Sequence, residues 1–279
     1  MYITLFLMSQ EALFKNNRAE SLGNVQSLQY TQTAEGQRSL LTGQSIRRAI
    51  RSQMQEINPE GLYRHNDACD TNSGYGYGPN RVPAMKDAKP DIDKEDDALL
   101  FGYMITGQKG TAVEETIKRR SPVFVADAIS SDLWDGDQGF GQGLSSDSGS
   151  LMPTKAHQHY TSYGVLITVN LGEVAVRPAA TERMFRAIAS GLRVGGNHAA
   201  HASELTPAYL VWRLHRTSPS VIGALNGKGL SYADAVTFLK AQYFEPQHVV
   251  GQDFYHAEFG AGWPQLFATL KDGFDQVPK

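Results

Sequence analysis

The chain has little of what marks several large protein classes. A single cysteine, Cys69, among 279 residues excludes an internal disulfide and a cysteine metal cluster, as is typical of proteins of the reducing cytoplasm. No apolar run approaches the length of a membrane span, and the apolar stretch from Met1 to Met8 lacks the basic residues of a signal peptide. We therefore expect a soluble, cytoplasmic protein that contacts no membrane.

A strong excess of charge is also missing. The net charge is −3 and the pI is about 6.2, so the chain does not coat nucleic acid by bulk charge. Any nucleic-acid site must be a local basic groove on a mildly acidic body. The hydrophobic content of 41% is enough for a core.

Motifs for a nucleophile, a nucleotide or a metal are absent as well. There is no nucleophile elbow, and the glycine clusters at 74–78 and 139–143 do not lie between a strand and a helix as a nucleotide-binding turn requires. The stretch 135–139 lacks the further ligands of a calcium loop, and the pair at His157 and His159 lacks a third ligand, so we interpret that pair as structural. We expect no metal, no cofactor and no catalytic residue.

What the chain does contain is a regular alternation of apolar elements. Apolar runs predict strands at 2–8, 122–129, 163–169 and 208–214, and helical spacing predicts helices at 43–55, 181–192 and 231–243, with a short one at 98–106. The order of the long elements, β-α-β-β-α-β, is that of the split βαβ or ferredoxin-like fold, which RNA-recognition domains share. We expect an α+β protein with such a palm.

Several polar segments are expected to be insertions into a single elaborated domain spanning residues 1–279. They are a finger-like insertion at 57–118, a loop insertion at 130–161 and a thumb-like connection at 194–207. The long polar stretch from residue 9 to residue 40 and the acidic, glycine-rich stretch from 130 to 155 are expected to be loops, the latter protruding and mobile. Asp96 or Asp97 is placed to cap the short helix.

The helix at 43–55 is the most informative element. Between residues 36 and 55 the chain has four arginines and no acidic residue. Ile46, Ala49, Ile50 and Met54 form a buried stripe, and the arginines fall on another face. Thr42 is a plausible N-cap, and a helix start with unpaired amides beside guanidinium groups suits a phosphate. The alternative is an ordinary solvated helix face.

Sequence blocks in and around this helix resemble a known family. The blocks are NNRAESLGN (16–24) followed by LTGQSIRRAIR (41–51), then KRRSPVFVADAIS (118–130) and GGNHA (195–199). In their order and spacing they resemble CRISPR-associated proteins of the RAMP superfamily, most of all the DevR-like backbone subunits of type I Cascade complexes. The resemblance covers most of the chain. It implies a modified RNA-recognition-motif palm with fingers and a thumb, which binds guide RNA (crRNA) without catalysis.

The resemblance and the basic residues together give a predicted RNA-binding set. The first helix would grip guide phosphates, the run at 118–120 would form a second wall of the same track, and the thumb-like connection would touch nucleotides. The predicted contacts are Arg18, Arg38, Gln44, Ser45, Arg47, Arg48, Arg51, Lys118, Arg119, Arg120, Asn197 and His198. The alternatives are a basic stretch that keeps a strand soluble at 118–120, and a flexible turn at 195–199.

The expected function is that of a non-catalytic subunit that polymerises along crRNA. Its expected partners are crRNA, the target DNA strand, further copies of itself in a helical filament and other Cascade subunits. One alternative is the related type III subunit, which cuts target RNA with an Asp between the first strand and the first helix; residues 9–41 contain no Asp. Another is a stand-alone single-stranded RNA-binding module. Base stacking on the third strand is disfavoured, because 163–166 lacks the required aromatic pattern.

Overall fold

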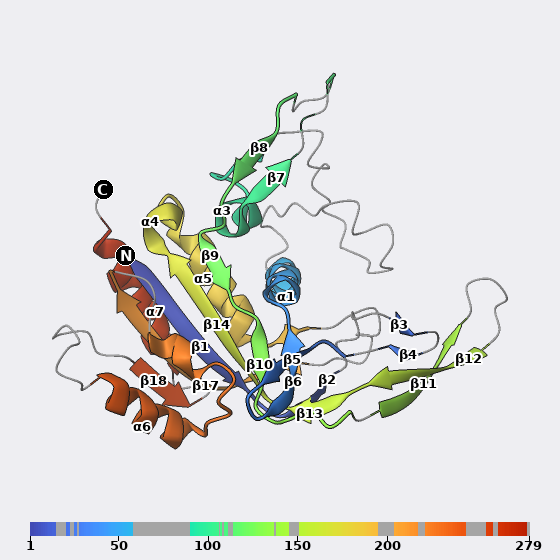
Figure 1. Ribbon diagram of the computed structural model, residues 1–279. Coiled ribbons are helices and arrows are strands. Elements are labelled where there is room, and N and C mark those ends of the chain that lie inside the picture. Colours follow the sequence, from blue (N-terminus) through green and yellow to red (C-terminus); the bar gives the residue numbers. More distant parts are fainter. Residues whose placement is uncertain are drawn as a thin grey trace.

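The computed structural model describes residues 1–14, 21–22, 25–26, 28–57, 90–105, 107, 109–110, 114–136, 138–144, 151–194, 204–216, 221–243, 255–258 and 262–277. These residues form an α+β structure built on an antiparallel sheet (Figure 1). In this described part, no helix is long and apolar enough to cross a membrane.

The main sheet has eight strands, with β1 and β14 side by side in its interior. Across it lie β18 (Tyr255–Glu258), β17 (Pro207–His215), β1 (Tyr2–Ser9), β14 (Tyr163–Asn170), β10 (Ala128–Ser130), β6 (Gly36–Leu41) and β5 (Tyr30–Thr33), while β9 (Val123–Val125) also pairs with β14. β1 pairs antiparallel with β14 on one edge and β17 on the other. Its residues from Ile3 to Ser9 are all buried, because both faces of the strand are packed.

Three helices cover one face of this sheet. They are α1 (Gly43–Ile57), α5 (Pro178–Ala189) and α7 (Gly262–Asp275), joined by the short α4 (Leu171–Val174). Their apolar residues share one core cluster with Ile3, Leu5 and Leu7 of β1. The opposite face carries a smaller cluster in which Phe6 and Met8 pack against the 3-10 helix η2 (Val221–Leu225) and α6 (Tyr232–Tyr243).

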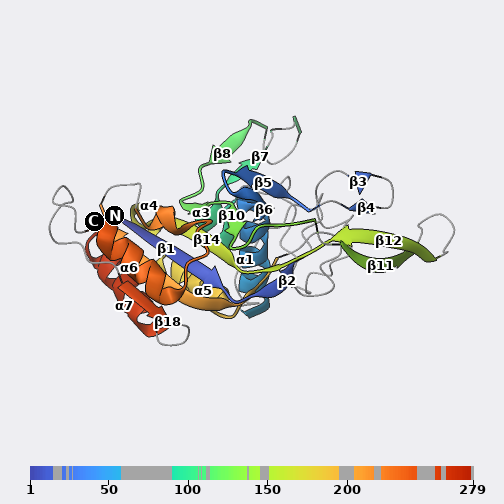
Figure 2. The same ribbon diagram turned by 60° about the horizontal axis from the view of Figure 1, so that its bottom comes forward.

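Smaller sheets surround this body. β2 (Ala12–Phe14) pairs with β13 (His159–Thr161), and β7 (Tyr103–Ile105) pairs with β8 (Ile117–Arg119) after the short helix α3 (Asp96–Phe101). β11 (Gln138–Leu144), β12 (Leu151–His157), β4 (Val25–Gln26) and β3 (Ser21–Leu22) form a fourth group, and β15 (Leu192–Arg193) pairs with β16 (Glu204–Leu205). Figures 1 and 2 show the β11–β12 and β7–β8 hairpins extending away from the main sheet.

The predicted long elements are confirmed, with one interruption. The strands at 2–8, 163–169 and 208–214 are β1, β14 and β17, and the long helices are α1, α5 and α6. The helix predicted at 181–192 is α5, which begins at Pro178 and ends at Ala189, and Leu192 lies in β15 instead. At the start of α6 the Ser231 hydroxyl accepts from the Asp234 amide at 3.2 Å and donates to the Asp234 carboxylate at 2.7 Å, so Ser231 caps this helix. The strand at 122–129 is interrupted at Ala126 and Asp127, so it forms β9 and β10 along the same edge of β14.

The predicted loops were wrong. Residues 9–40 contain β2 to β5 and most of β6, and residues 130–155 contain the hairpin of β11 and β12 rather than a bare loop. The glycines at 139, 141 and 143 recur every second residue, which is the period of a strand. Because glycine-rich segments are usually loops, this period was not recognised as a strand. The short helix begins at Asp96 with Glu95 as N-cap, so neither Asp96 nor Asp97 caps it, and it ends at Phe101 before β7. The helix α7 and the strand β18 were missed.

The helix α3 is fixed by a buried carboxylate. Asp96 is 1% exposed, and its two oxygens accept from Nε and Nη2 of Arg183 on α5, each at 2.7 Å. Arg177, which precedes α5, makes a further ion pair with Asp96. Two guanidinium groups on one carboxylate make this a strong, directional contact, because bidentate charged hydrogen bonds are the strongest that side chains form.

Replacing Asp96 by Ala should lower the free energy of unfolding by about 3 kcal/mol, because two cations lose their buried partner. Urea denaturation followed by circular dichroism measures this change. Glu182→Ala is the matched control, since the Glu182–Arg186 ion pair of α5 is exposed and should contribute less than about 1 kcal/mol. Equal losses in the two variants would contradict the role given to Asp96.

Candidate nucleic-acid interface

The start of α1 is closed by its own residues. The Ser45 amide donates to the Thr42 hydroxyl at 3.3 Å, and the Ser45 hydroxyl donates to the Thr42 carbonyl at 2.7 Å. Thr42 is therefore the N-cap that the sequence predicted. Ser45 is 9% exposed and its hydroxyl is bonded inside the protein, so it helps to form the helix start more than it offers a surface contact.

A second residue, from another strand, completes this helix start. The carboxylate of Asp127 accepts from the Gly43 amide at 2.8 Å, so a negative charge of the protein already lies at the positive end of α1. Asp127 lies in the interruption between β9 and β10, and the Asn226 side chain donates to its carbonyl at 2.9 Å. The sequence analysis missed this contact, and its one signal is an acidic residue inside an otherwise apolar strand run.

The close approach at this point requires glycine. A Cβ atom at Gly43 would lie 2.3 Å from the Val125 carbonyl oxygen, closer than real Cβ atoms come, and 3.1 Å from the carbonyl carbon. The backbone of α1 therefore rests directly on the end of β9. This contact, with the Asp127 cap, sets the height and direction of α1 over the sheet.

The arginines of α1 divide into two environments. Arg47 and Arg48 are half-buried, and Gln44 at the helix start is exposed. Arg51 lies deeper, with its guanidinium carbon 4.8 Å from the ring centroid of Phe101 on α3. Burial lowers the pKa of Arg51, while the Asp97 carboxylate raises it and Arg47 lowers it further; burial also lowers the pKa of Arg47. Arginine nevertheless keeps its charge. The outward part of the predicted face is thus Gln44, Arg47 and Arg48.

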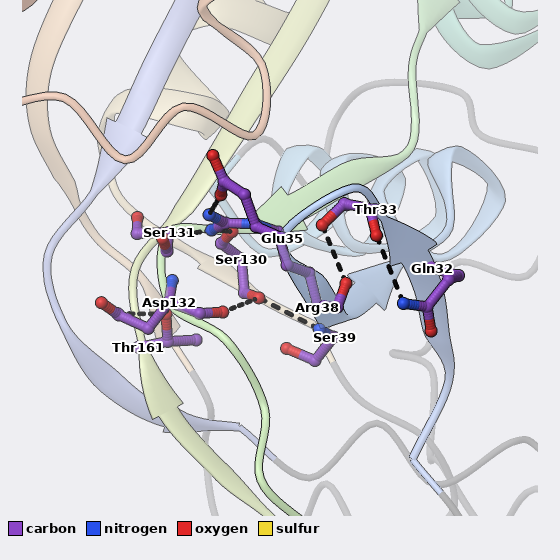
Figure 3. A network of polar contacts seen from close by, with 10 residues as sticks. Gln32, Thr33, Glu35, Arg38, Ser39, Ser130, Ser131, Asp132 and Thr161 are labelled. Atoms are coloured by element: carbon purple, nitrogen blue, oxygen red, sulfur yellow. Dashed lines mark hydrogen bonds and ion pairs between the residues drawn. The ribbon is translucent and has the colours of Figure 1, made fainter.

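Arg38 belongs to the interior of the protein. It is 7% exposed, and Nη1 donates to the carbonyls of Ser130 and Ser131, while Nη2 pairs with Glu35 at 2.6 Å (Figure 3). These contacts fasten β6 to the end of β10. We therefore remove Arg38 from the predicted phosphate contacts, because its donors are used to hold two strands and a turn together.

The basic run at 118–120 does not form one wall with α1 in the described contacts. Arg119 donates to the Glu173 carbonyl at 3.3 Å, next to α4, and the Arg120 guanidinium lies 5.2 Å from the ring centroid of Phe124 on β9. Lys118 is exposed, and with Arg119 it lines a pocket of about 590 Å³ under the β7–β8 hairpin. The second wall of the phosphate track therefore stays a prediction.

Three predicted contacts, Arg18, Asn197 and His198, lie outside the described residues. Within the described residues there is no group of three or more His, Cys, Asp or Glu side chains able to hold a metal ion. His159 is 7% exposed and its Nδ1 lies 2.7 Å from the Ser39 hydroxyl, which agrees with a structural role.

Comparison with known proteins finds no match by sequence and a shared fold by structure. No protein family model and no curated protein matches the chain. A solved chain of a CRISPR RNA-guided surveillance complex, in a pre-nicking state, superposes with a TM-score of 0.64 at 12% identity, over 98% of this chain and 100% of that one. A chain of a second CRISPR RNA-guided surveillance complex gives a TM-score of 0.60 at 13% identity, over 98% and 99%. The likeness establishes a shared fold over nearly the whole chain.

Gly43→Ala should lower the free energy of unfolding by about 2 kcal/mol, because the added methyl group meets the backbone of β9 and forces α1 to shift. Gly172→Ala on α4 is the control, since its Cβ would have an ordinary contact of 3.5 Å with the Asn170 side chain. Thermal unfolding of both variants against the parent chain measures the difference. A stable Gly43→Ala protein with an unchanged transition would show that the contact with β9 is unimportant.

Proposed function

We propose that this chain is a non-catalytic, guide-RNA-binding backbone subunit of a type I CRISPR surveillance complex. The observation that supports it most is the fold that 98% of this chain shares with chains of two CRISPR RNA-guided surveillance complexes. The sequence blocks point to the same class of complex independently of the fold. Guide RNA, target DNA, further copies of the chain and other complex subunits are the partners in this proposal.

In this proposal the palm is formed by four neighbouring strands in the main sheet. The four strands β17, β1, β14 and β9/β10 lie in the order fourth, first, third, second, and they are antiparallel neighbours. The helices α1 and α5 follow the first and third of these strands and cover one face. We infer that this unit is a ferredoxin-like, RNA-recognition-type palm, and that the other hairpins and the remaining insertions are its fingers and thumb.

The guide strand would lie along the side of α1 rather than on its tip. Asp127 already occupies the Gly43 amide, so an incoming phosphate would meet a carboxylate there. Arg47 and Arg48 offer positive charge one turn further along, with Gln44 as a neutral donor beside Arg48. Contacts of this kind bind the phosphate backbone and ignore base identity, as a subunit that accepts any guide needs.

The double variant Arg47→Gln, Arg48→Gln should weaken guide-RNA binding at least ten-fold and about equally for unrelated guides. The slope of log K against log salt should become shallower by about 1.4, at about 0.7 per lost phosphate contact on a single strand. Fluorescence anisotropy at several salt concentrations measures both quantities. Arg186→Gln, an exposed arginine of α5, is the matched control. A loss that depends on guide sequence would contradict phosphate binding.

Asp127→Asn should raise guide-RNA affinity about two- to five-fold, because it removes one negative charge near the phosphates and keeps an oxygen for the Gly43 amide. The same anisotropy measurement tests this, and thermal unfolding checks that the cap survives. A fall in affinity with an unchanged fold would mean that the Asp127 charge contributes to binding.

The type III alternative is tested by incubating the purified, RNA-loaded protein with complementary RNA and Mg²⁺. We expect no cleavage, since residues 9–41 contain no Asp and the Asp127 carboxylate caps a helix. Regularly spaced cuts, lost in Asp127→Asn, would favour the nuclease. A monomer that purifies free of nucleic acid from its own host would favour the stand-alone RNA-binding module.

A further inference from the structure

A pocket lies at the base of the β7–β8 hairpin, where the hairpin joins α3 (Figure 1). Its volume is about 590 Å³, which is within the range of pockets that bind small ligands. One wall is the segment before α3, and the other is the hairpin. The lining residues are Pro90, Asp91 and Ile92 on the first wall, and Tyr103, Lys118 and Arg119 on the second. No residue of α1 lines this pocket, so it is separate from the proposed guide contacts.

Both walls are held by contacts inside the protein. The Asp91 carbonyl accepts from the Lys94 amide at 3.1 Å and from the Glu95 amide at 2.7 Å, which closes a turn before α3. Gly102, at a φ of 64°, turns the chain from α3 into β7, and a Cβ atom there would lie 2.3 Å from the Arg119 carbonyl oxygen. The end of α3 therefore rests directly on β8. Walls held in this way lower the cost of ordering the site when a ligand binds.

Two cations of the pocket have no carboxylate partner in the described part of the chain. Neither Lys118 nor Arg119 forms an ion pair there, whereas the Asp91 carboxylate is paired with Lys94 at 3.1 Å. Arg119 donates from Nη2 to the Glu173 carbonyl at 3.3 Å, and its buried Nε has no acceptor among the described residues. The guanidinium thus keeps donors for an incoming anion, and a planar guanidinium matches a carboxylate or a phosphate.

The rest of the pocket offers apolar surface beside this charge. Tyr103 lies directly opposite Arg119 in the register of β7 and β8, so the two side chains share one face of the hairpin. On the other wall Pro90 is buried and Ile92 packs against the main core. A ligand that fills the pocket therefore needs an anionic group next to an apolar one.

Exposed carboxylates flank the residues that form the pocket. Asp93 follows the wall before α3, Glu173 supplies the carbonyl that Arg119 contacts, and Glu114 and Glu115 precede β8. A nucleic-acid strand carries a phosphate on every nucleotide, so it would bring further phosphates against these carboxylates. A single carboxylate on an apolar body avoids this repulsion. The charge pattern therefore favours an acidic peptide over a nucleic acid.

We propose that this pocket binds an acidic side chain of a partner protein, presented next to an apolar residue in a short peptide segment. The carboxylate would pair with Arg119 and Lys118, and the apolar neighbour would lie against Tyr103 and Ile92. This proposal goes beyond guide binding, because it gives Lys118 and Arg119 to a protein contact instead of the phosphate track. RNA binding by these two residues is the rival that the test must separate.

The test uses the full chain and a pool of acetylated, amidated tripeptides X-Glu-X, in which X is Leu, Ile, Phe or Tyr. Thermophoresis of the labelled protein measures binding, with the X-Gln-X pool as reference. The Glu pool should bind at least about ten-fold more tightly than the Gln pool. Arg119→Gln should weaken Glu-pool binding about ten-fold, and Lys118→Gln and Tyr103→Ala about three-fold. The controls Arg186→Gln and Lys240→Gln, which change exposed cations elsewhere, should bind within about two-fold of the parent chain.

Thermal unfolding checks that each variant is folded, and Lys118→Gln, at an exposed position, keeps the test decisive if Arg119→Gln does not fold. Equal binding of the two pools, or unchanged binding in the variants, would overturn the pocket. Phenylacetate binding as tightly as the peptides would identify a small-molecule site and overturn the protein partner. Loss of co-purified guide RNA in the Lys118 or Arg119 variant would assign the residue to the phosphate track and overturn the proposal. The proposed function is judged separately by Arg47→Gln with Arg48→Gln, which should lose guide RNA and still bind the Glu pool.

Discussion

The contact between the first turn of α1 and the break in the outer strand supports the rest of the site. Gly43 lies against the Val125 carbonyl, and Asp127 from the same break accepts its amide. The glycine lets the backbone of α1 touch the backbone of β9 with no side chain between them. The Asp127 carboxylate bonds a helix-start amide that would otherwise need water or a ligand. Because α1 leaves β6 directly before this point, its arginines are aimed by the sheet itself and not by surface loops.

Burial and exposure then sort four arginines that look alike in the sequence. Arg38 fastens β6 to β10, and Arg51 lies over Phe101 near Asp97. Arg47 and Arg48 remain partly open to solvent. The carboxylate of Asp96, which binds α3 to α5, holds α3 in place over Arg51. In the sequence these arginines look like one ligand site. In the structure Arg38 and Arg51 hold elements of the protein together, whereas Arg47 and Arg48 lie at the surface.

The sequence predicted the long elements whose apolar residues recur with a clear period and pack into the core. The strands β1, β14 and β17 and the helices α1, α5 and α6 were predicted because their apolar spacing is set by burial. Short strands were missed for two reasons: β2 has only three residues, too few to show a period, and β5 is mostly polar, so its backbone pairing leaves little trace in the side chains. The Asp127 cap was missed because the two partners are 84 residues apart. For the candidate site, the sequence indicated which arginines lie in and near α1. It did not indicate which of them are buried.

β9 has a consequence of its own. It is three residues long, and its middle side chain faces one side of the sheet while the outer two face the other. Val125 supports the start of α1 through its carbonyl, and Phe124 lies on the far side beneath Arg120. Neighbouring residues of a strand share one backbone. A shift of β9 that moves the Val125 carbonyl under α1 therefore also moves the Phe124 side chain on the opposite side of the sheet. The thin edge of the sheet is thereby a mechanical link between two surfaces that have no side chain in common.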